Sequence, residues 1–131
     1  MLTAEPLMSD NPSILVVDDD SAVRRAVARF LRAEGLSVLE ASNGEEGLTR
    51  LRETPEVSAI LLDLRMPIMD GWTFRREQRQ DPAIADIPVV IMSGADVDRF
   101  NELEAAATFE KPVQMSEVAV VLHKLCGTAE A

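Results

Sequence analysis

Acidic, hydroxyl and basic side chains in this sequence follow apolar runs of the kind that form strands. These residues are Asp18, Asp19, Asp20, Asp63, Ser93 and Lys111. Carboxylates that lie close together repel one another unless a cation lies between them, and Mg²⁺ is commonly held by one or two carboxylates. One carboxylate could then attack a phosphoryl group, while an ammonium and a hydroxyl bind the phosphoryl oxygens. The residue types therefore suit phosphoryl transfer to an aspartate beside a magnesium site.

The elements that must position these residues alternate between strand and helix. Short apolar runs predict strands at 14–17, 36–40, 58–63, 87–93 and 108–110. The stretches between and after them predict helices at 21–35, 43–53, 71–80, 96–107 and 113–127, of which the fourth is the weakest. This alternation predicts an α/β fold, a doubly wound parallel sheet of five strands with helices on both faces. Such sheets bind ligands at the carboxyl ends of their strands, where the polar residues fall.

Composition places the chain among single-domain globular proteins. Its 131 residues suffice for one core, and 47% hydrophobic with 27% charged residues is an ordinary balance. The net charge of −10 argues against direct nucleic-acid binding, which needs clustered Lys and Arg. No apolar run approaches the ~20 residues that cross a bilayer, and the start of the chain does not resemble a signal peptide. We therefore expect a cytoplasmic protein that does not insert into membranes.

The expected organisation is one domain with two short flanks. We expect a flexible leader over residues 1–12, a domain over 13–127 and a tail over 128–131. The single cysteine, Cys126, excludes an internal disulfide framework. The initial Met1 and the tail favour a chain that stands alone rather than one cut from a longer protein.

Four motifs occur in order on this pattern: ILVVDDD, LLDLRMPIMDGW, VVIMSG and EKPV. In their order and spacing they resemble the receiver domain of bacterial two-component response regulators, over about residues 13–126. The resemblance implies a flavodoxin-like fold with strand order 2-1-3-4-5. It also implies that the chain takes up a phosphoryl group on an aspartate and thereby changes its binding to other proteins.

The resemblance assigns the acidic residues. It makes Asp63 the phosphoacceptor and Asp18 and Asp19 the acidic pair that binds Mg²⁺. Asp19 would be a direct ligand, whereas Asp18 would act through water. Asp63 itself and the backbone carbonyl of Arg65 would complete the protein's share of the metal ligands. Asp20 is expected only to cap the helix that follows.

The resemblance also assigns the residues that bind the phosphoryl group. Ser93 stands where the family has a Ser or Thr that follows the phosphoryl group on activation. Lys111 corresponds to the family's phosphate-binding lysine, and its bond to Pro112 is expected to be cis. Met66-Pro67 and Asp70-Gly71 would shape the loop beyond the phosphoacceptor.

The sequence departs from the family pattern close to Lys111. Receivers usually carry Tyr or Phe three residues before this lysine, where the present chain has Thr108. Phe109 comes one residue later, and because strand side chains alternate it should point to the opposite face, into the core. The stretch from Ser93 to Lys111 is also shorter than usual, so we expect a short fourth helix.

These features support a stand-alone phosphoacceptor switch as the leading hypothesis. A histidine kinase or histidine phosphotransfer protein would donate the phosphoryl group, and an unidentified downstream protein would sense it. The chain would be no enzyme beyond its own phosphoryl transfer and dephosphorylation. The alternative is a receiver-like scaffold whose partner binding is largely independent of phosphorylation. A phosphohydrolase is disfavoured, because Arg65 occupies the position where such enzymes usually carry an acidic proton donor.

Overall fold

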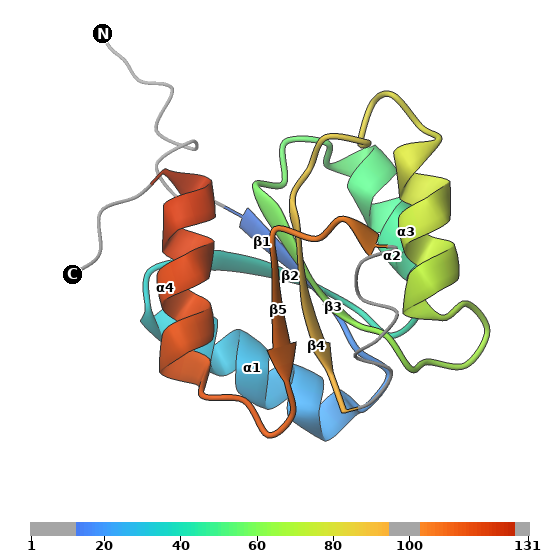
Figure 1. Cartoon of the computed structure of the whole chain (residues 1–131). Helices are drawn as coiled ribbons and strands as arrows, with labels where there is room; N and C mark the ends of the chain where they lie inside the picture. Colours follow the sequence, from blue (N-terminus) through green and yellow to red (C-terminus); the bar gives the residue numbers. More distant parts are fainter. Residues whose placement is uncertain (1–12, 95–102, 128–131) are drawn as a thin grey trace, which may run out of the picture.

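The computed structural model describes residues 13–94 and 103–127, which form a parallel sheet covered by helices (Figure 1). The strands are β1 (Ser13–Val17), β2 (Ser37–Ala41), β3 (Ala59–Asp63), β4 (Val89–Ser93) and β5 (Ala107–Glu110). All neighbouring pairs are parallel, and the order across the sheet is β2-β1-β3-β4-β5. This confirms the predicted flavodoxin-like fold. The predicted leader and tail lie outside the described residues, so the domain boundaries stay predictions.

In the described residues, four helices cover the two faces of the sheet. They are α1 (Ser21–Ala33), α2 (Gly44–Glu53), α3 (Gly71–Arg79) and α4 (Met115–Cys126). Helices α1 and α4 lie on one face, and α2 and α3 lie on the other (Figure 1). As predicted, Asp20 caps α1, since its carboxylate accepts the backbone N–H groups of Ala22 and Val23. None of the helices in the described part of the chain has the length and apolar character that a membrane span requires.

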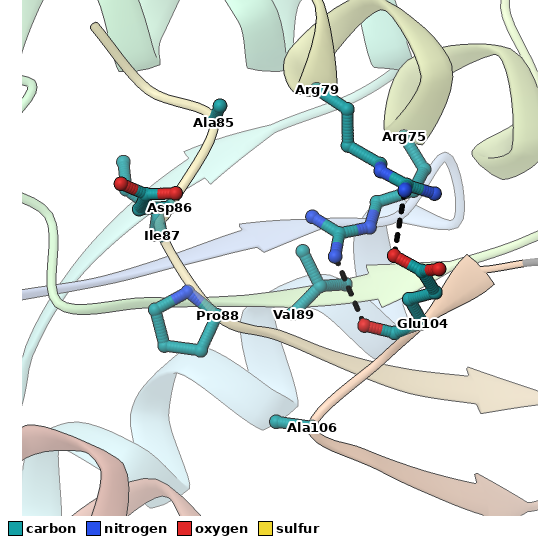
Figure 2. A pocket seen from close by; sticks show the side chains of 9 residues that line it. All are labelled: Arg75, Arg79, Ala85, Asp86, Ile87, Pro88, Val89, Glu104 and Ala106. Atoms are coloured by element: carbon teal, nitrogen blue, oxygen red, sulfur yellow. Dashed lines mark hydrogen bonds and ion pairs between the residues drawn. The ribbon is translucent and has the colours of Figure 1, made fainter. Parts of the chain in front are cut away.

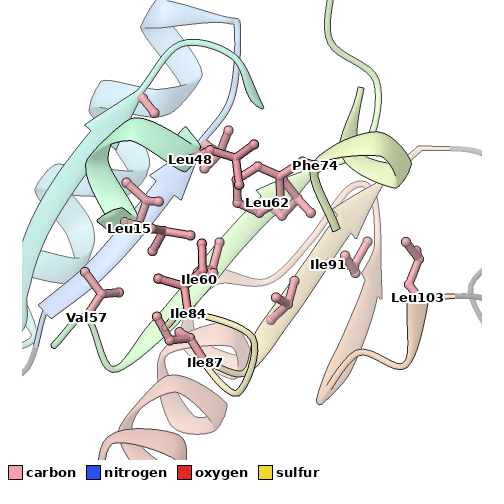
Figure 3. Close-up of a cluster of buried hydrophobic side chains, with 14 of the residues drawn as sticks. Leu15, Leu48, Val57, Ile60, Leu62, Phe74, Ile84, Ile87, Ile91 and Leu103 are labelled. Atoms are coloured by element: carbon pink, nitrogen blue, oxygen red, sulfur yellow. The ribbon is translucent and has the colours of Figure 1, made fainter. Parts of the chain in front are cut away.

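Each face of the sheet has its own hydrophobic core, because alternate residues of a strand point to opposite sides. The core under α2 and α3 includes Leu15, Leu48, Ile60, Leu62 and Phe74 (Figure 3). The core under α1 and α4 includes Ile14, Val16, Leu31, Leu61 and Leu122. Strands β1 and β3 contribute to both cores and are buried along nearly their whole length. The ends of these two strands are therefore rigid supports for whatever follows them.

The helix predicted over 96–107 is wrong at its C-terminal end, and residues 95–102 lie outside the described part of the chain. Ala107 already belongs to β5, where it pairs with Val90, and the backbone N–H of Ala106 donates to Val89 O at 2.8 Å. Glu104 has a φ of 49°, which a right-handed helix does not allow. The alanines favour a helix by propensity, but pairing with β4 overrides that preference. The predicted short length of this helix is not tested by the described residues.

Candidate functional site

Three carboxylates meet at the carboxyl ends of β1 and β3. These two strands are neighbours, so Asp18, directly after β1, and Asp63, the last residue of β3, come together. One oxygen from each of Asp18, Asp19 and Asp63 lies within 4.8 Å of the others. Asp18 is 1% exposed and Asp63 is 6% exposed, whereas Asp19 is open to solvent. The structure therefore brings together all three predicted acidic residues.

Burial makes the carboxyl groups of Asp18 and Asp63 harder to ionise. The pKa of Asp18 is raised chiefly because burial removes water from its carboxylate. Burial also raises the pKa of Asp63, and the nearby charge of Asp18 raises it further. Lys111 opposes both effects, and its Nζ lies 3.5 Å from Asp63 Oδ1. Within residues 13–94 and 103–127, one ammonium faces three carboxylates, so this group of side chains carries excess negative charge.

One oxygen of the cluster marks where a cation would fit. Asp18 Oδ1 accepts the backbone N–H of Asp20 at 2.9 Å. Asp18 Oδ2 is buried, yet within the described ranges 13–94 and 103–127 no hydrogen-bond donor reaches it. A buried acceptor without a donor is costly unless a cation completes it. Oxygen ligands with excess negative charge match what Mg²⁺ requires, so the residues present fit this ion.

Ser93 and Lys111 lie beside this cluster, on β4 and immediately after β5. Ser93 is fully buried at the end of β4, next to the end of β3, where Asp63 pairs with Met92. The backbone N–H of Lys111 donates to Ser93 O at 2.8 Å, which ties the lysine to the same edge of the sheet. The peptide bond between Lys111 and Pro112 is cis, as predicted.

The loop after Asp63 is packed tightly against the start of α3. The backbone N–H of Gly71 donates to Leu64 O at 2.8 Å, and a Cβ at Gly71 would lie 2.7 Å from Leu64 Cα. Only glycine allows this approach, which explains Asp70-Gly71. Asp70 caps α3 by accepting the N–H of Thr73. Arg65 donates its backbone N–H to the Asp63 carboxylate, which offsets part of the rise in the pKa of Asp63.

This loop also borders a cavity of about 380 Å³, lined by Leu64, Arg65, Met66, Pro67, Asp70 and Trp72. Ile68, at the tip of the loop, is 76% exposed and has a φ of 70°, which is rare for a β-branched residue. The loop that follows the phosphoacceptor candidate is thus closely packed at its base and open at its tip.

Strand β5 places Thr108 and Phe109 on opposite faces, as predicted. Thr108 is exposed and pairs with Ile91, whose side chain belongs to the core under α2 and α3. Phe109 pairs with Met92 and packs against the core under α1 and α4. No bulge restores the aromatic side chain to the position of Thr108.

A second charged region lies at the amino ends of β4 and β5, away from the carboxylates. It borders a cavity of about 480 Å³ between α3 and these strands (Figure 2). Arg75 is only 8% exposed and donates to the backbone carbonyls of Leu103 and Glu104 and to Gln78 Oε1. Arg79 forms an ion pair with Glu104 at 2.6 Å.

The sequence did not single out Arg75, because arginines on a predicted helix are normally solvated. A weak signal exists, since Phe74 and Gln78 are four residues apart and lie on the buried face that Arg75 adjoins. Its acceptors come from residues far along the chain, so helical periodicity could not identify its role.

Comparison with known proteins agrees with this fold. Residues 14–123 match the family described as the response regulator receiver domain, so the chain belongs to that family. A rice protein (Oryza sativa subsp. japonica), "Two-component response regulator ORR5", is 37% identical over 120 residues, which cover 88% of this chain and 87% of that protein. The "Sensor histidine kinase CheAY" of Helicobacter pylori is 35% identical over 98 residues, which cover 72% of this chain but only 12% of that protein.

Solved structures support the same assignment. A response regulator receiver protein from Pseudomonas putida superposes with a TM-score of 0.82 at 26% identity, over 87% of this chain and 97% of that chain. The same domain therefore occurs in similar proteins both nearly alone and as a small part of a much longer kinase. The role of the whole protein is a separate question from the identity of the domain.

Proposed function

We propose that this chain is a phosphoacceptor switch, in which Asp63 takes a phosphoryl group from a phosphohistidine in the presence of Mg²⁺. The observation that carries the proposal is the setting of Asp63. It is nearly buried, it lies beside Asp18 and Asp19, and Lys111 Nζ is 3.5 Å from its Oδ1. A carboxylate in a structural role has no need of two further carboxylates and a lysine at the same edge.

The transfer follows from these positions. A carboxylate oxygen of Asp63 attacks phosphorus, and the bond from phosphorus to the histidine nitrogen breaks with its electron pair returning to the imidazole. Mg²⁺, when bound, would neutralise the negative charge of the phosphoryl oxygens. Asp18, Asp19, Asp63 and the backbone carbonyl of Arg65 are the residues that would hold it.

The phosphoryl group would be retained by residues of β4 and of the segment after β5. Lys111 can turn from Asp63 to a phosphoryl oxygen, and Ser93 can donate its hydroxyl hydrogen to another. Both are fixed to the same edge by the bond between Lys111 N–H and Ser93 O. Attack of water on the phosphoryl group would later restore the carboxylate. In this proposal the chain catalyses only its own phosphorylation and dephosphorylation.

The proposed partners follow from this chemistry. The donor is a histidine kinase or a histidine phosphotransfer protein, and a sensor histidine kinase and a sensor kinase are among the proteins to which this chain is similar. The receiver of the signal is a further protein, bound with an affinity that differs between the two phosphorylation states.

The direct test is incubation with acetyl phosphate and Mg²⁺, followed by intact mass measurement. We expect the wild type to gain one phosphoryl group and the Asp63→Asn variant to gain none. Asp86→Asn is the matched control, because Asp86 is an exposed aspartate before β4 and should leave the gain unchanged. No gain in the wild type, or an equal gain in Asp63→Asn, would overturn the proposal.

A second candidate is a binding module whose partner affinity scarcely depends on phosphorylation. The exposed Thr108 favours it, since the family usually carries an aromatic switch residue there, and Phe109 packs on the other face. The test is partner affinity with and without beryllofluoride, which mimics the phosphoryl group. A change of about tenfold or more, equivalent to ~1.4 kcal/mol, would exclude this candidate.

A further inference from the structure

In the described part of the chain, Asp18 is held by hydrogen bonds at every polar atom except Oδ2. Its backbone N–H donates to Ala41 O at 3.1 Å, and its Oδ1 accepts the N–H of Asp20 at 2.9 Å. Its backbone carbonyl accepts Arg24 Nη1 at 2.9 Å. Only Oδ2 has no donor among residues 13–94 and 103–127. The contacts around Asp18 therefore determine where that oxygen lies.

Arg24 is the member of this set that reaches Asp18 with its side chain. It is the fourth residue of α1, and its Nε donates to Glu40 Oε1 on β2 at 3.1 Å. The two side chains are 14% and 26% exposed, so this ion pair is partly shielded from water. Glu40 is held in turn by Arg32, whose Nη2 lies 3.6 Å from Glu40 Oε2 and donates to Val38 O at 3.0 Å.

The contact between Arg24 and the Asp18 carbonyl acts on two carboxylates at once. That carbonyl belongs to the planar peptide group that joins Asp18 to Asp19. When the guanidinium holds the carbonyl, it sets the rotation of this peptide and hence the direction in which the Asp19 backbone leaves it. Asp19 is exposed and is the predicted direct ligand, so it has few other contacts to orient it.

We propose that Arg24 and Glu40 form a positioning pair that fixes the Asp18–Asp19 peptide and so presets the two carboxylates for the divalent cation. The inference rests on the proposed function for the identity of the ion. Neither residue touches the cation; Glu40 orients the guanidinium, and the guanidinium orients the peptide. Residues of this outer kind typically change metal affinity by about 10- to 100-fold when they are replaced.

The charge of Arg24 and its positioning role predict opposite changes in Mg²⁺ affinity when Arg24 is replaced. A guanidinium near a cation site repels the cation, so charge alone predicts that loss of Arg24 strengthens Mg²⁺ binding. Positioning predicts the opposite, because a peptide free to rotate must be ordered again when the ion binds. Of these two effects, only positioning therefore predicts that removal of Arg24 lowers the affinity for Mg²⁺.

The experiment is isothermal titration calorimetry with MgCl₂ on the full chain, after circular dichroism has confirmed that each variant is folded. In Arg24→Met, which keeps the apolar stem, Mg²⁺ affinity should fall by about tenfold. Arg24→Lys keeps the charge but lacks the planar fork that reaches both Glu40 and the carbonyl, so it should also lose affinity. The matched control is Arg25→Met, an exposed neighbour on α1, which should bind Mg²⁺ as well as the wild type or slightly better.

Glu40→Gln provides a second route that does not alter Arg24. It should lower the affinity less than Arg24→Met, and the double variant should bind no more weakly than Arg24→Met alone, since the pair acts through one contact. Equal or tighter binding by Arg24→Met overturns the proposal, as does wild-type affinity in Arg24→Lys. So does a wild type that binds no Mg²⁺.

The outcome is separable from that of the proposed function. A wild type that binds Mg²⁺ but takes up no phosphoryl group refutes the phosphoacceptor role, yet the order of Mg²⁺ affinities among the variants still decides the positioning role. Conversely, normal phosphorylation with unchanged Mg²⁺ affinity in Arg24→Met refutes only the positioning pair.

Discussion

At the carboxyl ends of β1 and β3, Asp18 and Asp63 are buried side by side, whereas at the amino end of β4 the buried charge is Arg75. Arg75 donates from Nε, Nη1 and Nη2 to three well-placed acceptors. The two aspartates instead repel one another, and Lys111 is the ammonium that faces them. Both regions bury charge, but each guanidinium nitrogen of Arg75 has an acceptor, whereas Asp18 Oδ2 has no donor among residues 13–94 and 103–127.

The difference distinguishes a buried charge that stabilises the fold from a buried charge that a ligand could complete. A buried charge with complete hydrogen bonding joins segments and is costly to remove. A buried charge that is left incomplete destabilises the chain by itself, and such sites persist where a ligand completes them. Arg75 joins α3 to the segment before β5, whereas Asp18 and Asp63 are the residues that we propose bind a cation and a phosphoryl group. Opposite effects of mutation at the two ends of the sheet are therefore expected.

The largest expected effect is loss of stability at the satisfied charge. Arg75→Met leaves Gln78 Oε1 and the carbonyls of Leu103 and Glu104 without their donor, so we expect the free energy of unfolding to fall by about 3 kcal/mol. Urea denaturation measures it. Arg76→Met, the exposed neighbour on α3, is the control and should change stability by no more than about 0.5 kcal/mol. A loss below about 1 kcal/mol would remove the distinction between the two regions.

An intermediate effect is expected from Mg²⁺ on the unsatisfied charges. At ten times its Kd, Mg²⁺ should raise the free energy of unfolding by about 1.4 kcal/mol, because it binds the folded chain alone. Thermal denaturation with Mg²⁺ and with EDTA measures the difference. Asp18→Asn should lose most of this gain, whereas Arg75→Met should keep it although it starts from lower stability. An equal gain in Asp18→Asn would show that the ion binds elsewhere.

The smallest expected effect has the opposite sign to that at Arg75. Without Mg²⁺ at pH 7, Asp63→Asn should raise the free energy of unfolding by about 1 kcal/mol, since it removes one of the mutually repelling buried charges. Urea denaturation of both proteins measures it. A clear loss of stability would mean that the pairing of Asp63 with Lys111 outweighs the repulsion from Asp18.

The same pair of proteins should differ in pH dependence. The pKa of Asp63 is raised by burial and by Asp18, so the folded chain holds this proton more tightly than the unfolded chain does. This contribution to stability is complete below the ordinary aspartate pKa of about 4 and is lost as the pH rises through the raised value. The stability advantage of Asp63→Asn should therefore shrink on acidification from pH 7 toward pH 4. An advantage that grows on acidification would contradict the raised pKa.

The sequence alone was sufficient for the fold and for the clustering of the acidic residues. Apolar runs alternated with amphipathic stretches, and polar residues followed the runs, so Asp18, Asp63, Ser93 and Lys111 had to meet at one edge of a parallel sheet. The same alternation placed Phe109 opposite Thr108. The alternation of strands and helices follows from local periodicity, whereas the strand order was implied by the resemblance to receiver domains.

Only the tertiary structure decided how the buried charges are completed. The acceptors of Arg75 at Leu103 and Glu104 lie 28 and 29 residues away, and Glu40 lies 16 residues from Arg24. The start of β5 at Ala107 was likewise decided by pairing with β4 against the helical preference of alanine. Periodicity tells which face of an element is buried, but not which distant carbonyl or carboxylate meets a charge there. That depends on the packing of segments far apart in the chain, which gave Arg75 its acceptors and left Asp18 Oδ2 without a donor in the described part of the chain.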